Sequence, residues 1–295
     1  MTERVEFAVD GTTCVGHLRG ADGSEPRPGV VMCTGFGGTQ DTPAHAATAE
    51  DFVRAGYAVL TFDYRNFGES GGTPRQLVDI AGQLDDIAAA VACARRHPGI
   101  DPDRVVLWGT SLGGGHVVVA ASRDPRVAAV ISQIPFNGFP KKVEGRSAGT
   151  TLKLLAAMAH DALRGALRLP PAYIKAVAAR GELAVMPSDE AQQAIAGMQS
   201  ATWRNETAPR ALFAMMRYRP AESARNVTVP VLVCTGDGDR ETPPELTAAL
   251  AQAIPKGELR TYPYPHFAFY QPAIREQVTT DQLAFLGRVV GTGPR

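Results

Sequence analysis

Ser111 lies in the pentapeptide Gly109-Thr110-Ser111-Leu112-Gly113, which has the form G-x-S-x-G. A serine hydroxyl is a weak nucleophile until a neighbouring base removes its proton, so such a serine must be exposed and held in place. A sharp turn between a strand and a helix holds it in this way. The turn closes only when small residues stand two positions before and after the serine, and Gly109 and Gly113 meet that requirement. The spacing therefore predicts a nucleophilic serine.

The residues on either side of the motif predict the strand and the helix that this turn needs. Residues 104–108 form a short apolar run of the kind found in buried strands, and residues 111–121 have the composition of an apolar helix. A helix that begins at Ser111 directs its free amides and the positive end of its dipole toward the serine hydroxyl. The motif therefore has the local context that its chemistry requires.

Short strand-like runs alternate with helical stretches along most of the chain. Asp10-Gly11 joins two alternating runs at residues 4–9 and 12–19, which is a strong signal for a hairpin. Further strands are predicted at residues 30–33, 57–62, 104–108, 127–131, 229–234 and 259–262. Helices are predicted at residues 43–55, 74–96, 111–121, 244–253 and 274–290. This order predicts an α/β fold with a mostly parallel eight-stranded sheet, covered by helices on both faces and preceded by an antiparallel hairpin.

Residues 136–225 interrupt the alternation. This stretch contains no convincing strand and is rich in Ala, Leu and Met, with its clearest helical parts at residues 152–169 and 172–179. We interpret it as a helical cap inserted into an α/β core formed by residues 1–135 and 226–295, and a helix-rich peripheral layer is the alternative. Its apolar side chains serve either packing or an acyl or alcohol pocket. The pocket candidates are Phe136, Phe139, Trp203, Met215 and Met216.

Composition argues against several classes of partner. The 30 Lys and Arg residues balance 30 Asp and Glu residues, so nothing indicates a polyanionic ligand such as a nucleic acid. No apolar run reaches the roughly 18 residues of a membrane helix, and the N-terminus lacks the pattern of a secretory signal. We expect a cytoplasmic protein that acts on a small-molecule substrate and binds neither nucleic acid nor membrane. The sequence leaves room for a homo-oligomer.

No cofactor or metal site is predicted either. The four cysteines are scattered without Cys-x-x-Cys pairs, which favours free thiols over zinc or a disulfide framework. The chain has no P-loop and no G-x-G-x-x-G between a strand and a helix, so a nucleotide cofactor is not expected.

Two further segments accompany the serine motif. Gly35-Phe36-Gly37-Gly38 follows the third predicted strand, and a segment running from Asp63 to Ser70, Asp-Tyr-Arg-Asn-Phe-Gly-Glu-Ser, follows the fourth. With these segments, the chain resembles the α/β-hydrolase superfamily over nearly its whole length. It is most similar to the dienelactone-hydrolase-like and X-prolyl-peptidase-like serine esterases. We interpret Asp63 and Arg65 as a local structural pair rather than a second polar site.

The resemblance implies where an oxyanion would be bound. In the family, the backbone amide after the nucleophile and another after the third strand form the oxyanion hole. On this chain these amides belong to Leu112 and Phe36. Thr34 departs from the family pattern, since many relatives carry His before the Gly, but a backbone amide does not depend on that side chain.

The resemblance also implies the two partners of the serine, because the chain order in this fold is Ser, then Asp or Glu, then His. Of the six histidines, His160 and His266 follow the elbow helix, and His266 comes just after the last strand, where the family places its base. The acid follows the seventh strand, where the pattern Gly-x-x-Asp selects Asp239 and leaves Asp237 in reserve. The expected triad is Ser111, Asp239 and His266.

These residues would make the protein a serine hydrolase that cleaves a carboxylic ester or thioester of a medium-sized apolar molecule through an acyl-enzyme. The same triad would serve an amidase or peptidase, a lactonase, a carbon–carbon-bond hydrolase, or an acyl transferase or cyclase of secondary metabolism. A different alternative is a ligand-binding protein that keeps the fold without turnover. The complete Ser, Asp and His set favours the enzyme, because a binding protein needs none of the three.

Overall fold

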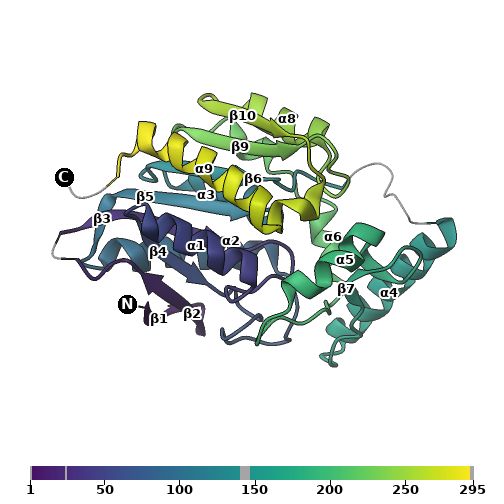
Figure 1. Ribbon diagram of the computed structural model, residues 1–295. Helices are drawn as coiled ribbons and strands as arrows, with labels where there is room; N and C mark the ends of the chain where they lie inside the picture. The colour runs from purple at the N-terminus through teal and green to yellow at the C-terminus, as the bar shows by residue number, and fades with distance from the viewer. Residues whose placement is uncertain (1, 24, 140–146, 293–295) are drawn as a thin grey trace.

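The computed structural model describes residues 2–23, 25–139 and 147–292. Within these ranges eight strands form one twisted sheet (Figure 1). The strands are β1 (Thr2–Val9), β2 (Thr12–Arg19), β3 (Arg27–Cys33), β4 (Ala58–Phe62), β5 (Ile100–Thr110), β6 (Ala129–Gln133), β9 (Val231–Gly236) and β10 (Gly257–Tyr262). Their order across the sheet is β1-β2-β4-β3-β5-β6-β9-β10. Strand β2 pairs antiparallel with both β1 and β4, and the remaining pairs are parallel, so the predicted fold class is confirmed.

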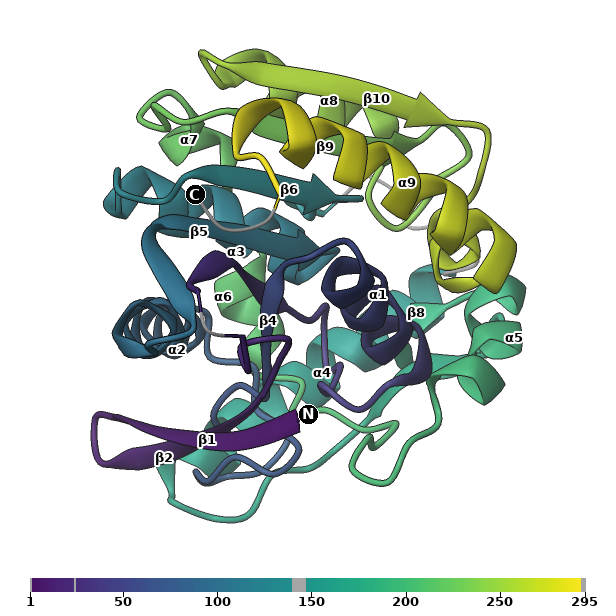
Figure 2. The same ribbon diagram turned by 60° about the vertical axis from the view of Figure 1, so that its left-hand side comes forward.

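Helices cover both faces of this sheet, as the sequence predicts. They are α1 (Pro43–Arg54), α2 (Ile80–Arg96), α3 (Leu112–Arg123), α8 (Pro244–Ala253) and α9 (Pro272–Val289), and the short 3-10 helix η1 (His266–Tyr270) precedes α9. Helices α1 and α9 lie side by side against one face (Figure 2). Helices α2, α3 and α8 pack on the other face. Helix α2 begins six residues later than predicted, because Gln76 adopts a positive φ of 57° that no α-helix contains.

Successive side chains of the central strands alternate between the two halves of the core. In β3, Met32 belongs to the cluster under α1 and α9, whereas Val31 and Cys33 belong to the cluster under α2 and α3. All three side chains are fully buried. Because strands in the middle of the sheet are covered on both faces, they read as continuous apolar runs in the sequence.

The segment between β6 and β9 differs from its prediction. We call residues 136–225 the insertion. Its elements are α4 (Ala148–Ala166), β7 (Lys175–Ala178), β8 (Ala184–Pro187), α5 (Asp189–Met198), α6 (Ala211–Met215) and α7 (Ala221–Ala224). Figure 1 shows α4, α5, α6 and β7 beyond one end of the sheet. The prediction that this segment contains no strand is wrong, and so is the helix predicted at residues 172–179, because β7 and β8 pair in parallel as a separate two-stranded sheet.

A side chain outside the sheet explains why β7 is a strand. The backbone N–H of Val177 donates to Asn205 Oδ1 (2.9 Å), and Asn205 Nδ2 donates back to the Val177 carbonyl (2.9 Å). Asn205 therefore acts as a neighbouring strand would, and Val177 is fully buried. The Ala-rich local sequence favours a helix, but these distant contacts outweigh that preference. Across the described ranges, no helix has the length and hydropathy that crossing a bilayer requires.

Candidate active site

Ser111 occupies a tight turn between β5 and α3. Its backbone has φ 55° and ψ −119°, a strained conformation for a residue with a side chain. A Cβ atom at Gly109 would clash with the Gly113 carbonyl, and one at Gly113 would clash with the Thr34 carbonyl. Both flanking glycines are therefore required by close backbone approach, as the spacing predicts.

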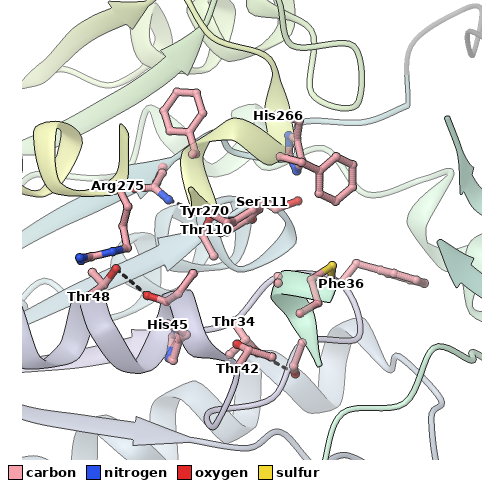
Figure 3. A pocket seen from close by; sticks show the side chains of 18 of the residues that line it. Thr34, Phe36, Thr42, His45, Thr48, Thr110, Ser111, His266, Tyr270 and Arg275 are labelled. Atoms are coloured by element: carbon pink, nitrogen blue, oxygen red, sulfur yellow. Dashed lines mark hydrogen bonds between the residues drawn. The ribbon is translucent and has the colours of Figure 1, made fainter. Parts of the chain in front are cut away.

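Backbone hydrogen bonds hold the turn against the end of β6. The N–H of Ser111 donates to the Gln133 carbonyl (2.9 Å), and the N–H of Phe136 donates to the Ser111 carbonyl (2.8 Å). The hydroxyl of Ser111 has no hydrogen-bond partner among the described residues, and it faces the pocket shown in Figure 3. A strained turn thus presents an uncommitted hydroxyl.

A network of side-chain hydrogen bonds in the protein interior supports the turn. Thr110 Oγ1 lies 3.1 Å from Tyr270 Oη and accepts from Gln133 Nε2 (3.2 Å). The amide of Gln282 donates to Gln133 Oε1 (2.8 Å) and its oxygen accepts from Trp108 Nε1 (2.9 Å). These residues connect β5, β6, η1 and α9 in the interior. The network fixes the residue next to Ser111, and no local sequence pattern indicates it.

His266 and Asp239 form a buried pair. Nδ1 of His266 lies 2.7 Å from Asp239 Oδ2, and both residues are at most 3% exposed. Asp239 Oδ1 also accepts from the backbone N–H groups of Glu241 (2.9 Å) and Thr242 (2.7 Å), and Oδ2 accepts from Thr242 Oγ1 (2.8 Å). These donors fix the orientation of the Asp239 carboxylate. The imidazole is therefore held with Nδ1–H donating to Asp239 and Nε2 left as an acceptor.

The electrostatics of the site act on His266. Burial by itself lowers the pKa of His266, but the charge of Asp239 and its hydrogen bond, with Glu241 and Glu190 further away, raise that pKa above its ordinary value. Figure 3 shows the imidazole of His266 and the hydroxyl of Ser111 turned toward one another at the same end of the pocket. Within the described chain these two side chains are not yet hydrogen-bonded to each other. Such contacts often tighten only when a ligand binds.

The other ionisable candidates lie elsewhere. Asp237 is exposed beside the turn that Asp239 occupies, and His160 is exposed on α4. His116 is fully buried on α3, between Tyr218 Oη (2.8 Å) and Gln83 Oε1 (3.0 Å). Burial lowers the pKa of His116 to about 3, so it is a neutral packed side chain.

The amides of Phe36 and Leu112 flank Ser111. Neither N–H donates a hydrogen bond to any residue that the structure describes, and both residues line recesses that contain Ser111. Gly35 approaches so closely that a Cβ there would lie 3.1 Å from Ser111 Cβ. Thr34 Oγ1 donates to the Gly38 carbonyl (3.1 Å), which braces the loop from within. Thr34 therefore has a structural role in this loop.

Asp63 anchors the far end of the same loop. Its carboxylate accepts from the backbone N–H of Gln40 (2.8 Å) and from the N–H of Glu69 (2.9 Å). The predicted pairing of Asp63 with Arg65 is wrong, because Arg65 forms its ion pair with the buried Asp86 (2.8 Å). Both groups are structural, as expected, but they stabilise different loops.

In the described part of the chain, two recesses meet at Ser111, and Phe36 and Met186 border both. We call one the His266 recess; its lining includes His266, Tyr270, Trp108, Met198 and Thr48. We call the other the Leu112 recess; its lining includes Leu112, Phe136, Phe139, Val185, Met215 and Arg240. Figure 3 shows the His266 recess extending from Ser111 and Phe36 toward Thr48 and Arg275.

Three of the five predicted pocket residues line the Leu112 recess, namely Phe136, Phe139 and Met215. The other two line neither recess. Met216 is 49% exposed, and Trp203 packs against the main apolar cluster. The helical period explains the difference, since Met215 and Met216 are neighbours on α6 and point about 100° apart.

The sequence analysis missed the contribution of β8 and α5. Val185 and Met186 from β8, and Gly197 and Met198 from α5, line the recesses. One signal was available: Ser188 followed by Asp189 and Glu190 is a typical helix start, and Ser188 Oγ does accept from the Ala191 N–H (3.0 Å). No group of three or more His, Cys, Asp or Glu side chains suited to a metal occurs within the described ranges.

Comparison with known proteins finds relatives along the whole chain. Quorum-quenching protein AidA of Acinetobacter baumannii (strain MDR-ZJ06) is 39% identical over 289 residues, covering 97% of this chain and 94% of that protein. Thiohydrolase aneE of Aspergillus aculeatus is 43% identical over 132 residues, 44% of this chain and 41% of its own. The crystal structure of the α/β hydrolase GrgF from Penicillium sp. sh18 superposes with a TM-score of 0.82 at 23% identity, covering 98% of this chain and 99% of that one.

A family profile described as serine aminopeptidase, S33, matches residues 24–268, which include the turn at Ser111, Asp239 and His266. The match spans most of the chain, and the α/β hydrolase GrgF shares the overall fold. The chain therefore belongs to this serine aminopeptidase S33 family of α/β hydrolases.

Proposed function

We propose that the protein is a serine hydrolase that cleaves a carboxylic ester or thioester of a medium-sized, largely apolar molecule through an acyl-enzyme. One observation carries the proposal. A buried His266 held by Asp239 at 2.7 Å lines the same pocket as the hydroxyl of Ser111 on its strained turn. A nucleophile, a base and an orienting acid in this order form the arrangement used for acyl transfer.

The reaction follows from the atoms in place. Nε2 of His266 takes the proton of Ser111 as Oγ attacks the acyl carbonyl, and Asp239 stabilises the imidazolium without accepting its proton. The amides of Phe36 and Leu112 donate to the oxyanion that forms, where fixed donors lower the barrier most. His266 then gives its proton to the departing alcohol or thiol. Water activated by His266 releases the acid from Ser111.

The two recesses hold the two halves of the substrate. The leaving group must lie on the side of His266, because His266 protonates it, so it occupies the His266 recess. The acyl chain occupies the Leu112 recess, which contains the oxyanion donors but not His266. Phe136, Phe139 and Met215 make this second recess largely apolar, which suits an acyl chain.

The insertion acts as a cap over the core formed by residues 1–135 and 226–295. Met186 of β8 borders both recesses, and α5 adds Gly197 and Met198 to one of them. The insertion therefore contributes to substrate preference in both recesses. The described cysteines are free thiols, which supports a cytoplasmic location. The name of the thiohydrolase relative favours a thioester within this substrate class.

A fluorophosphonate probe, which reacts with activated serines, tests the proposal. We expect the wild-type protein to be labelled and Ser111→Ala to be unlabelled, and we expect turnover of acyl p-nitrophenyl esters to fall by roughly 10⁶-fold in the variant. Ser122 is half-buried on α3, where its hydroxyl donates to the Val119 carbonyl (2.7 Å), so Ser122→Ala serves as the control and should label normally. Absence of labelling in the wild-type protein would instead support a ligand-binding protein without turnover.

A further inference from the structure

Glu190 connects the insertion to the segment that carries His266. It lies in the first turn of α5, and its Oε1 accepts a hydrogen bond from the backbone N–H of Phe267 at 2.6 Å. The two residues are 77 positions apart in the chain. A short bond between a carboxylate and a backbone N–H is among the stronger hydrogen bonds in proteins. Helix α5 is therefore attached directly to η1.

The attachment point is the residue next to the proposed base. Phe267 is 5% exposed, and its ring lies edge-on to the imidazole of His266 with ring centroids 5.2 Å apart. The N–H of Phe267 lies in the first turn of η1, where a helix offers its own amides no acceptor. Glu190 supplies that acceptor, so it fixes the backbone from which His266 projects.

Glu190 also contributes charge to His266. The acids that face His266 are Asp239 and Glu241 from the loop after β9 and Glu190 from α5, while Tyr270 and Arg275 line the same recess. Each of the three carboxylates raises the pKa of His266 against the opposing effect of burial. The charge of Glu190 thus acts on the imidazole of His266, and its hydrogen bond holds the backbone of the next residue, Phe267.

The other end of α5 is attached to the loop that carries Phe36. Asp41, just beyond that loop, accepts from Ser200 Oγ (2.8 Å), from the Thr202 N–H (3.1 Å) and from Thr202 Oγ1 (2.7 Å). Helix α5, which adds Gly197 and Met198 to the His266 recess, therefore has one carboxylate contact in its first turn and another just beyond its last residue. Its position is coupled to both loops that surround Ser111.

We propose that Glu190 is a positioning residue for His266, which holds the imidazole in register with Ser111 through the backbone of Phe267 and makes that register depend on the docking of α5. The inference rests on the proposed function, because it assigns Glu190 a role only if His266 is the base.

The test is the rate at which a fluorophosphonate labels Ser111 between about pH 5 and 9, since labelling requires neutral His266. Glu190→Gln keeps an oxygen that accepts from Phe267 but removes the charge, so the acid limb should move to lower pH with a plateau close to wild type. Glu190→Ala removes both, so its plateau should fall by roughly 10- to 100-fold. Asp189→Asn is the matched control, because Asp189 is exposed in the same turn and pairs with Arg180 (3.4 Å). It should change neither limb nor plateau.

The outcomes separate this inference from the proposed function. Normal labelling of all variants, with an unshifted acid limb in Glu190→Gln, overturns the role of Glu190 and leaves the serine hydrolase intact. Absence of labelling in the wild-type protein overturns both. If Glu190→Ala does not fold, Glu190→Asp decides, because its shorter side chain keeps the charge but draws the carboxylate away from the Phe267 N–H. Its plateau should also fall, and a plateau equal to that of wild type overturns the role of Glu190.

Discussion

At the scale of single residues, the site depends on which partners each polar group has. The hydroxyl of Ser111 has no partner in the described structure, whereas Asp239 accepts four hydrogen bonds, one of them from His266. A carboxylate held by this many donors is fixed in position, and its oxygens accept from each of them. This forces the imidazole to donate through Nδ1, which leaves Nε2 free to accept a proton.

Asp239→Asn tests this dependence. The asparagine amide offers a donor to Nδ1, so His266 carries its proton on Nε2 and cannot act as a base toward Ser111. We expect the rate of ester hydrolysis near neutral pH to fall by about 10⁴-fold, as when the acid of a comparable triad is replaced. Asp237→Asn is the control, since Asp237 is exposed nearby. Activity within tenfold of wild type in Asp239→Asn would remove Asp239 from the triad.

At the scale of elements, sequence patterns predict correctly those elements that consecutive residues specify. The strand, turn and helix around Ser111 are specified by consecutive residues. Gly109 is required by the nearby Gly113 carbonyl, whereas Gly113 is required by the Thr34 carbonyl of a distant loop. Asp239 and His266 could be chosen because chain order in the resembling fold restricts the candidates. The geometry then brings both together in one buried pair.

The remaining elements depend on distant contacts that no local pattern contains. The strand Lys175–Ala178 is Ala-rich and reads as helix, yet it pairs with β8 and with Asn205. Glu190 reads as an ordinary first-turn acid, yet its partner is 77 residues away. The sequence therefore predicts the core sheet and the triad candidates, while the inner surface of the insertion emerges only from the three-dimensional structure.

The two recesses predict separate effects on specificity. Phe139→Ala removes an aromatic ring that lines the Leu112 recess, so a long acyl chain loses an apolar contact there. We expect kcat/KM for long acyl esters to fall by about 10-fold or more relative to acetyl esters, with little effect on leaving-group preference. Met198→Ala should do the reverse, because Met198 lines the His266 recess. A matrix of p-nitrophenyl and alkyl esters of varied acyl length measures both ratios. If each variant changed the ratio expected for the other, the assignment of acyl and leaving groups would be reversed.

At the scale of the whole molecule, stability depends on the histidines enclosed by the core. Burial lowers the pKa of both His45 and His116 to about 3, well below the value near 6.5 of an unfolded chain. Below that pH the unfolded state binds protons that the folded state does not. Stability is therefore fully present above about pH 6.5 and is lost as the pH falls toward 3.

His116→Gln measures one part of this loss. Glutamine does not titrate and can still bond to Tyr218 or Gln83. We expect the free energy of unfolding of the variant, from urea titrations at pH 7, 6 and 5, to decline less steeply than that of wild type, by about 1 kcal/mol per pH unit. His160→Gln, at an exposed position, should follow the wild type. Parallel slopes for His116→Gln and wild type would show that His116 binds protons equally in the folded and unfolded states, which would contradict its lowered pKa.

The two outer strands of the sheet have a consequence for how copies of this protein can meet. Glu3, Arg4 and Glu6 are exposed along β1, and Glu258 and Arg260 are exposed along β10. Charged side chains on border strands oppose pairing with a strand of another molecule, because the charges would lose water on contact. The pairing of sheets from different molecules into one continuous sheet is therefore disfavoured at both edge strands.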